Sequence, residues 1–465
     1  MPSFHASFSR RLLLLPATDF LFPKLQATNL SDPRLLRLIL RIGAPAILGL
    51  SANAINQLID ALWITRLSPI AMAGVGIAFP VIILMTATTA GIGVAISGEI
   101  GRRLGRNDTS GAQSVALSVV IGLGIGSYVD VILPVFGAST ETFPIAKLYI
   151  TVLLWGLPIM TFQIIADYVA LGSGNSRRSM QTLLACFGLN IVLDPIFIFG
   201  FGWGVTGAAL ATVAGQLLAC CIYIVWFRKG TLGLYPFAGS VASAHIRNLV
   251  RFAPPVVVVN LLMAFSFVVL LSGMARLAGD VHVAALAFDL RLATLIMIPV
   301  QGLALGAQAA ISHAHGHCKP LRANHLIHLT LALSVGTGVI LTCLVVAGGR
   351  FLFPIMIPAP AMQQAAASMF PYFAGFIIGS CAYIPLLSGC RATDRALFSA
   401  VVALAPNGYV MVPLILLLPL VWGLSGLLWA IALSGVVTAV IAGVLHLIML
   451  SRSSVTVTAA PADTA

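Results

Sequence analysis

Apolar runs of membrane-spanning length follow one another along most of the chain, separated by short stretches of polar residues, glycine and proline. A helix that crosses the hydrocarbon core of a bilayer needs about 20 mostly apolar residues. Twelve runs meet this length, so the pattern predicts an all-α, polytopic membrane protein with twelve transmembrane helices. The predicted spans are 43–66, 70–98, 113–137, 146–171, 180–200, 204–227, 250–276, 283–311, 326–350, 365–390, 396–419 and 422–450.

The composition excludes other classes of protein. Of the 465 residues 59% are hydrophobic and only 8% are charged, whereas a soluble domain carries about 25% charged residues. The net charge of +12 is spread over the connections rather than gathered on a soluble module, so we expect no nucleic-acid partner. The seven cysteines lack metal-ligand spacing. We therefore expect no cofactor and no bound metal, and the lipid bilayer as the protein's surroundings.

The positions of the basic residues predict the orientation. Of 25 Lys and Arg, 20 fall in the two tails and in the loops after even-numbered spans, four fall on the opposite side, and Arg291 lies inside the eighth span. Cytoplasmic loops concentrate Lys and Arg, so both termini are predicted to be cytoplasmic, in a bacterial-type inner (plasma) membrane. The segment around Arg10 and Arg11 hints at an export signal, but Pro16 and Asp19 interrupt its apolar stretch, which favours an uncleaved tail.

The two halves of the chain repeat each other. At an offset of 211, Gly105 matches Gly316, and at an offset of 219 the run 202–207 matches 421–426. Each half holds six spans, so the repeat is parallel, with its axis along the membrane normal. The predicted organisation is a tail (1–42), a first lobe (43–227), a linker (228–249), a second lobe (250–450) and a second tail (451–465).

Four carboxylates are predicted to lie inside spans, away from the ends of the helices: Asp60, Asp130, Asp167 and Asp194. An acid at the centre of a transmembrane helix costs at least about 2.5–3.5 kcal/mol, so such residues are candidates for function. The alternative is a residue that snorkels or pairs with a neighbour. We favour that alternative for Asp130, which lies near the outer end of its span.

Asp60 belongs to a polar stripe on the first predicted helix. Asn53, Gln57 and Asp60 share one face at i, i+4 and i+7, and Asn56 lies one turn before Asp60. Such a stripe either serves packing between helices or forms part of a site. The cost of the buried acid favours a site.

The fifth span carries Asn190 and Asp194 on one face, followed directly by Pro195. Proline has no amide hydrogen, so the carbonyl of Ile191 loses its helical partner and a kink is expected. A bent helix with an amide, an acid and a freed carbonyl can bind a proton or a small cation. The alternative is an Asp that bonds only to its own kinked backbone.

At these residues the chain resembles the multidrug and toxic compound extrusion (MATE) family, in its DinF-like branch. The runs NIVLDPIFI and GVTGAA resemble the fifth and sixth helices of that branch, and NQLID and AGVGIAFP, after Pro45, resemble its first two. GRND resembles its loop between helices two and three. The resemblance extends from about residue 34 to 450, and the runs occupy 190–198, 204–209, 56–60, 73–80 and 105–108.

The resemblance implies a site for a coupling cation in the first lobe. It also implies that this chain departs from the branch at the fourth helix, where Asp167 stands in place of the usual Asn. A third acid would add repulsion or binding charge to the site. The implied core is Asp60, Asn190 and Asp194, with Thr212 as a hydroxyl ligand and Asp167 and Tyr149 as neighbours.

The resulting hypothesis is a monomeric antiporter, not an enzyme, that exports amphipathic, cationic organic compounds in exchange for protons or sodium by alternating access. The second lobe lacks matching acids, which favours coupling in the first lobe and leaves H+ and Na+ both open, with H+ preferred. A lipid-linked saccharide flippase of the same superfamily is the alternative. Its anionic cargo needs cations in the cavity, and one Arg against four acids inside the spans weighs against it.

Three weaker signals receive structural interpretations. The histidines of 313–317 are predicted to lie in a solvated cytoplasmic loop, and Asp289 and Arg291 to pack or pair. Ser425 and His446 mimic an intramembrane protease, but 21 residues along one helix separate them by about 30 Å. The sequence therefore gives no strong reason to expect an intramembrane enzyme.

Overall fold

The structure is a computed structural model that describes residues 28–67, 75, 86, 89–91, 93–94, 96–106, 143–232, 253–357 and 360–458. Most of the second predicted span and the whole of the third, with Asp130, lie outside these residues. So do most of the first tail and most of the predicted linker.

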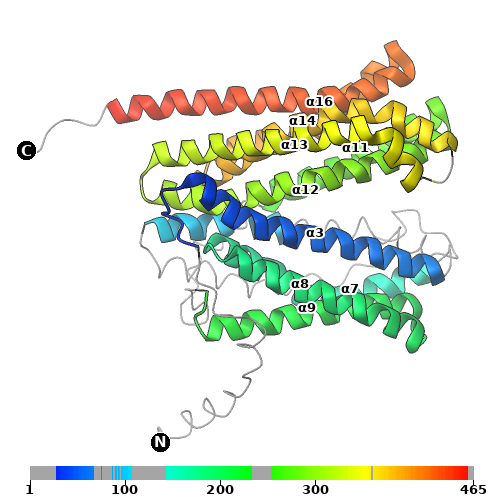
Figure 1. Cartoon of the computed structure of the whole chain (residues 1–465), viewed down its shortest axis with the longest axis horizontal. Helices are drawn as coiled ribbons and strands as arrows, with labels where there is room; N and C mark the ends of the chain where they lie inside the picture. Colours follow the sequence, from blue (N-terminus) through cyan, green and yellow to red (C-terminus); the bar gives the residue numbers. More distant parts are fainter. Residues whose placement is uncertain are drawn as a thin grey trace, which may run out of the picture.

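The described chain is a bundle of long helices in two groups (Figure 1). Eight of its helices are long and apolar enough to cross a membrane. The first group holds α3 (Leu35–Leu67), α7 (Phe143–Gly172), α8 (Ser176–Pro195), the π-helical turn η3 (Ile196–Gly200) and α9 (Gly204–Arg228). The second group holds α11 (Ala253–Ala278), α12 (Asp280–Gly316), α13 (Pro320–Met356), α14 (Pro360–Ala392), α15 (Ala396–Leu404) and α16 (Met411–Thr458).

Several boundaries differ from the predicted ones. α3 begins at Leu35 rather than at 43, because Leu38, Ile39 and Ile42 continue its buried face. The eleventh span is broken: α15 ends at Leu404, and the chain turns through 405–410 before α16 begins. α16 then bends at Gly423 and continues to Thr458, so part of the predicted second tail is helical.

The backbone repeats at the predicted offset of 219. Gly204 and Gly423 both adopt left-handed conformations, with φ of 55° and 54°. Three residues later, a Cβ on Gly207 would lie 2.7 Å from the carbonyl oxygen of Phe197, and one on Gly426 would lie 2.2 Å from that of Leu418. Both helices therefore pack by the same close approach to the segment before them.

The two groups, the N-lobe and the C-lobe, meet along α3 and α12. A Cβ on Gly306 would lie 2.9 Å from the Cα of Gly43, so the two helix backbones touch there. Gly105 and Gly316, which the offset of 211 relates, also face each other, since a Cβ on Gly105 would lie 3.0 Å from the Cα of Gly316. A contact between equivalent residues is expected beside the axis of a parallel repeat.

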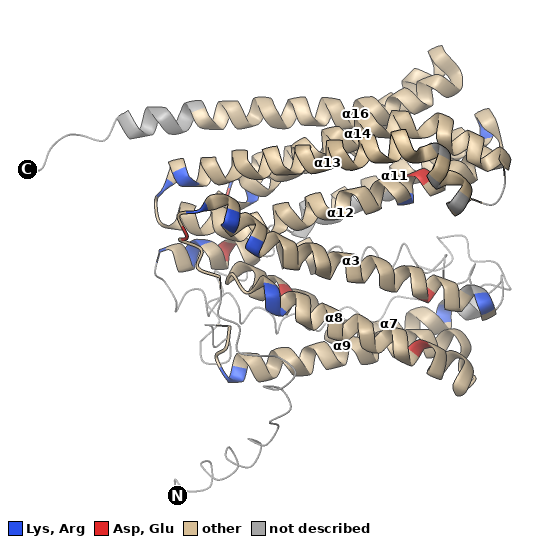
Figure 2. Cartoon of the chain, viewed as in Figure 1, with Lys and Arg blue, Asp and Glu red and all other residues tan. Residues whose placement is uncertain are grey.

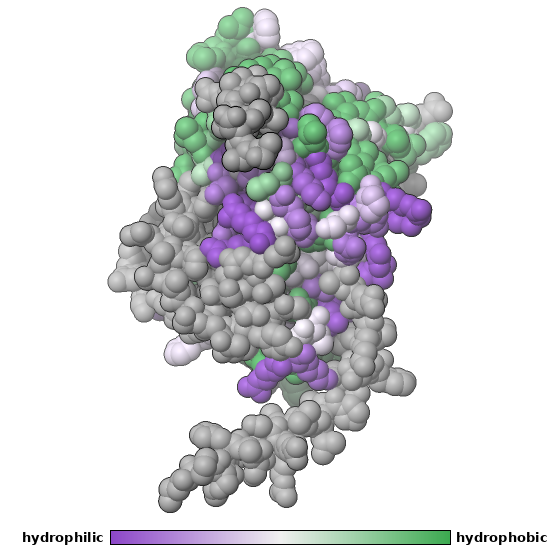
Figure 3. Space-filling view, turned by 90° about the vertical axis from the view of Figure 1, so that its left-hand side faces the viewer, coloured by the Kyte–Doolittle hydropathy of each residue, from purple (hydrophilic) through white to green (hydrophobic). Residues whose placement is uncertain are grey.

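Lys and Arg are concentrated at one end of the bundle (Figure 2). We call this the basic end; α12 and α14 finish there, and it carries Arg102, Arg103, Arg106, Arg322 and Arg391. Figure 3 looks onto this end, where hydrophilic residues lie among apolar flanks. The opposite end, where α3 finishes and α12 begins, is called the outer end. Figure 1 shows α3 and α12 adjacent toward the basic end and diverging toward the outer end.

Candidate functional site

Two carboxyl groups from different helices meet in the outer half of the N-lobe. Asp60 lies on α3 and Asp194 near the end of α8, and their carboxyl groups lie within hydrogen-bonding range of each other. Two carboxylates carry no proton to donate, so the pair would form a hydrogen bond only if one of them bound a proton. The helix register therefore brings together the two acids that the sequence singled out.

An asparagine one turn earlier on the same helix supports each acid. Asn56 Nδ2 donates to Asp60 Oδ2 at 3.0 Å, and Asn190 Nδ2 donates to Asp194 Oδ1 at 3.3 Å. Asn56, Asn190 and Asp194 are only 5%, 2% and 1% exposed. Each amide occupies one oxygen of its acid and leaves the other oxygen without a donor among the described residues.

The cluster holds an excess of oxygen acceptors. Asn56 Oδ1, Asp60 Oδ1, Asn190 Oδ1 and Asp194 Oδ2 are buried and lack a hydrogen-bond partner among the described residues. Buried polar atoms are almost always paired, because an unpaired one costs about 1–3 kcal/mol. An added proton, or a hard cation that prefers oxygen ligands, would satisfy such a set.

Thr212 of α9 completes one side of the cluster. Its hydroxyl donates to the carbonyl of Ala208 at 3.1 Å, which leaves its oxygen to face Asn190 Nδ2 at 3.5 Å. The backbone of α8 changes directly after Asp194: Pro195 ends the α-helix, and the turn that follows is π-helical. The expected irregularity is present and lies next to the acid, as π-helical turns often do at functional sites.

Tyr149 of α7 lies near both acids, within electrostatic range of Asp60 and Asp194. It packs against an apolar cluster that includes Ile64, Ile198 and Ala208. This packing covers the acids on the side of the outer end.

The remaining members of the polar stripe separate from the acid pair. Gln57 Nε2 donates to Asn53 Oδ1 at 3.2 Å, and Gln57 is exposed whereas Asn56 is buried. Asn56 and Asp60 thus face the interior of the N-lobe, while Asn53 and Gln57 lie on its surface.

Asp167 does not lie beside the pair, contrary to the prediction. It accepts hydrogen bonds from the Tyr223 hydroxyl and, at 2.5 Å, from Gln163 Nε2, and it contacts Ser179. Ser179 precedes Asp194 by 15 residues on α8, which corresponds to about 22 Å along the helix. Asp167 therefore belongs to a separate buried cluster toward the basic end.

The C-lobe holds two charged residues that the sequence reading assigned to packing or pairing. Asp289 of α12 is 0% exposed, and neither of its carboxylate oxygens has a partner among the described residues. Arg291 is exposed and takes part in none of the ion pairs of the described chain. Positions two apart on a helix point about 200° away from each other, so these two cannot pair. Of the two predicted alternatives, packing or pairing, the structure excludes a pair between these two residues.

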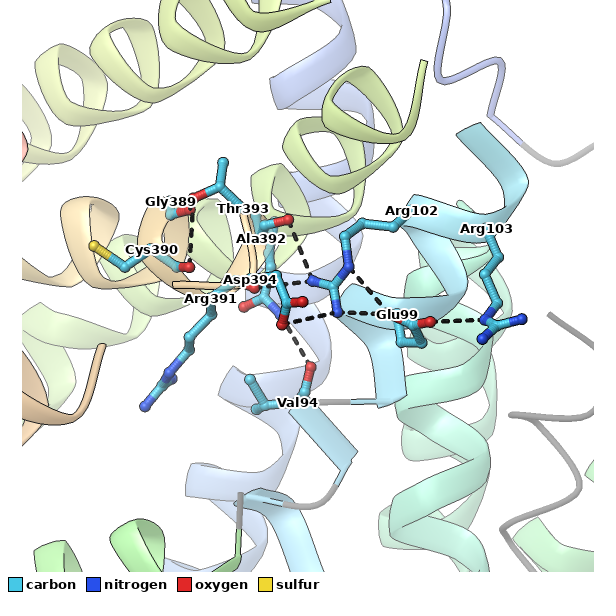
Figure 4. A network of polar contacts seen from close by, with 11 residues as sticks. Val94, Glu99, Arg102, Arg103, Gly389, Cys390, Arg391, Ala392, Thr393 and Asp394 are labelled. Carbon is cyan, nitrogen blue, oxygen red and sulfur yellow. Dashed lines mark hydrogen bonds and ion pairs between the residues drawn. The ribbon is translucent and has the colours of Figure 1, made fainter. Parts of the chain in front are cut away.

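A polar network joins the lobes at the basic end (Figure 4). Arg102 bonds Glu99 of its own helix at 2.7 Å, and its other terminal nitrogen donates to the carbonyls of Arg391 and Ala392 at 3.1 and 3.3 Å. Asp394 adds an ion pair at 3.6 Å. These bonds attach the N-lobe to the last turn of α14, and sequence reasoning missed them because they join residues nearly 290 positions apart.

The histidines form no metal centre in the described part of the chain, which contains no group of three or more His, Cys, Asp or Glu that could hold a metal. His313 and His315 lie in the last turn of α12 rather than in a loop. His446 faces His328, with their Nε2 atoms 3.0 Å apart. This partner differs from Ser425, the residue required by the protease interpretation.

Comparison with known proteins identifies the family. The MatE family profile matches residues 45–196 and 255–417. The chain is 23% identical to the FAD transporter of Shewanella oneidensis over 435 residues, which cover 87% of this chain and 92% of that protein. It is 24% identical to the multidrug export protein MepA of Staphylococcus aureus over 448 residues, which cover 90% and 94%.

Solved structures share the fold. An outward-facing multidrug resistance MATE family transporter superposes with a TM-score of 0.84 at 23% identity, covering 92% of this chain and 99% of that one. A transporter from Pyrococcus furiosus, described as having a binding pocket of reversed polarity, superposes with a TM-score of 0.83 over the same shares at 23% identity. Twelve-helix transporters thus share this architecture. The chain belongs to the MatE family, the multidrug and toxic compound extrusion transporters.

Proposed function

We propose that the protein is a secondary antiporter that exports amphipathic organic compounds, cationic ones included, in exchange for protons or sodium. One observation carries the proposal: Asp60 and Asp194 face each other within a cluster in which four buried oxygens have no hydrogen-bond partner among the described residues. A proton between the carboxyls would satisfy two of these oxygens. A sodium ion would use the carboxylate and amide oxygens together.

The coupling would work through the bend at Pro195. α8 contributes Asn190 and Asp194 to the cluster and changes to a π-helical turn directly afterwards. When the coupling cation leaves, the two carboxylates repel each other at close range in a buried site. Relief of this repulsion would move α8 relative to α3, so that cation and cargo favour different arrangements of the N-lobe.

We infer that the basic end lies in the cytoplasm of a bacterial-type inner membrane, with both termini on that side. Arg102 joins the lobes at this end, whereas α3 and α12 diverge toward the outer end (Figure 1). This arrangement corresponds to a state closed toward the cytoplasm. In that state the acid pair, which lies in the outer half, would exchange its cation with the exterior.

A flippase for lipid-linked saccharides is the second candidate. A pyrophosphate group carries at least two negative charges and calls for several cations. Among the described charged residues that lie inside the predicted spans and away from their ends, Arg291 is the one cation. The exporter is therefore preferred, and the names of MepA and of the FAD transporter agree with a small-molecule cargo.

The test is dye efflux from proteoliposomes under one gradient at a time. A pH gradient or a sodium gradient is imposed separately on wild type, Asp60→Asn and Asp194→Asn. We expect one of the gradients to drive efflux by the wild type, and both variants to lose that response. Asp32→Asn, which removes a carboxylate outside the pair and keeps a side-chain oxygen for the backbone amide of Arg34, serves as the control. Wild-type coupled efflux by either Asn variant would overturn the assignment.

A further inference from the structure

Arg291 is a charged residue in an unusual position for a membrane protein. It lies 11 residues from the start of α12, about 16 Å inside the outer end of the helix. Its side chain is exposed and forms no ion pair in the described chain. A cation at this depth rarely faces lipid tails; such residues face the interior or a water-filled space.

The register of α12 points Arg291 toward the N-lobe. Gly302, one of the residues through which α12 touches α3, would place a Cβ 2.8 Å from the backbone of Ile47. Eleven residues separate it from Arg291, and at 100° per residue the two lie within about 20° of each other around the helix. The face that packs against α3 near the basic end therefore carries Arg291 where α3 has diverged.

Gln57 lies opposite on α3. A Cβ added to Gly43 would lie 3.0 Å from Leu303, so this side of α3 faces α12. Gln57 is 14 residues further along α3. At 100° per residue, its side chain points within about 40° of that same direction. Fourteen residues along α3 and twelve along α12 both correspond to about 20 Å from the contact. Arg291 and Gln57 thus stand at the same depth on facing surfaces, and both are exposed.

The acids of the described spans are turned away from these surfaces. Asp194 and Asp167 are buried inside the N-lobe, Asp60 lies within hydrogen-bonding range of Asp194, and Asp289 is buried inside the C-lobe. Arg291 is therefore the exposed charge between the lobes, so far as the described residues go. The count of four acids to one Arg, taken from the sequence, gives the wrong sign for the charge that a cargo would meet here.

We propose that Arg291 binds an anionic group, a carboxylate or a single phosphate, on an amphipathic cargo held between α3 and α12, with Gln57 as a neutral polar contact on the other side. This deepens the proposed function and rests on it. The guanidinium offers a fork of donors that suits both groups. A cationic ring system and an acidic substituent can coexist in one cargo, so the proposal adds a requirement to the substrate class.

The test uses matched ligands that differ only in the anionic group. For the carboxylate, a zwitterionic rhodamine with a free carboxyl is compared with its methyl ester; for the phosphate, riboflavin 5′-phosphate is compared with riboflavin. Binding to purified protein in detergent is measured by fluorescence anisotropy. We expect wild type to prefer the anionic member of at least one pair by about 10- to 100-fold, the range for a charge-assisted hydrogen bond.

Three variants separate the roles. Arg291→Gln is expected to lose the preference and to bind the ester or riboflavin as wild type does; Gln57→Ala is expected to weaken both members of a pair equally. Arg276→Gln removes an exposed cation at the outer end of α11 and is expected to retain the preference. Equal wild-type binding within both pairs, or a preference that survives Arg291→Gln, would overturn the proposal. Because this binding needs no ion gradient, its outcome is independent of the coupling measured with Asp60→Asn and Asp194→Asn.

Discussion

The bridge that Arg102 makes between the lobes gives a quantitative prediction about the state closed at the basic end. Replacing Arg102 with Gln removes its bonds to the carbonyls of Arg391 and Ala392 and its ion pair with Asp394. The bond to Glu99 lies within one helix, so its loss affects both states of the transporter alike. The variant should therefore shift the equilibrium toward opening at this end.

The magnitude follows from the bonds that cross between the lobes. A hydrogen bond to a charged donor contributes about 1.5–3 kcal/mol, and the two carbonyls end α14, where the helix dipole favours a cation. At 3.1 and 3.3 Å these bonds belong at the low end of the range, about 3 kcal/mol together. The ion pair adds little, because Asp394 is 58% exposed. A change of about 3 kcal/mol corresponds to a shift of about 100-fold.

The assay is a distance measurement between spin labels at Arg228 and Leu321, which are both exposed at the basic end, one in each lobe. It uses a background in which the seven cysteines are replaced. The long-distance population should rise from a few per cent to more than half in Arg102→Gln. Arg106→Gln, which removes an exposed cation at the end of the same helix, should resemble the background. A change below threefold in Arg102→Gln would refute the reasoning.

The same spin-label measurement would test how the Arg102 bridge responds to pH. Burial raises the pKa of Glu99, but Arg102 and Arg103 outweigh burial and hold this pKa below its ordinary value of 4.5. A lowered pKa means that the ion pairs are fully formed above the ordinary value and are lost only as the pH falls through the lowered one. The closed population set by this bridge should therefore stay constant between about pH 5.5 and 9.

Three stability predictions can be checked by thermal unfolding in detergent. Asp167→Asn should cost about 1–3 kcal/mol, because an amide NH2 would face the donors Tyr223 and Gln163, yet it should leave the ion dependence of efflux unchanged; altered ion dependence would return Asp167 to the coupling site. Asp289→Leu should raise the midpoint, because it removes a buried carboxyl that has no hydrogen-bond partner among the described residues; a lower midpoint would reveal a partner. Gly204→Ala should cost about 1–2 kcal/mol at its φ of 55°, whereas Gly188→Ala, with open space around its Cβ, should not; equal effects would contradict the backbone argument.

The predictable features were those that depend on local pattern. Apolar length predicted membrane helices, and the repeat of Gly204 at Gly423 appears in the backbone as two matching left-handed glycines. Spacing predicted that Asn56 lies one turn before Asp60 and that Asn190 and Asp194 share a face, whereas the meeting of the two acids was implied by the family resemblance alone. The proline after Asp194 marked the irregular turn.

The errors arose where the position of a residue along its helix, or the direction of its side chain, mattered more than the residue type. Asp167 and Tyr149 are on one helix, but 18 residues separate them, which is about 27 Å. That spacing alone argues against one shared site. Asp289 and Arg291 point to opposite sides, so interpreting them together as packing or pairing residues concealed one buried acid and one exposed cation. The Arg102 bridge depends on the packing of two lobes, which no local pattern contains.

The central claim is that Asp60 and Asp194 bind the coupling ion, which the transporter exchanges for cargo. The most direct test is to measure the uptake or release of protons when cargo binds. A dye cargo is added to purified protein in weakly buffered detergent solution at pH 7, and the proton count is read in two buffers of different ionisation enthalpy. If protons are the coupling ion, wild type should release close to one proton per bound dye, and Asp60→Asn and Asp194→Asn should release none while still binding. If sodium is the ion, the release should be absent and dye affinity should fall as sodium rises, in wild type only. Proton release and sodium dependence unchanged in both variants would contradict the account.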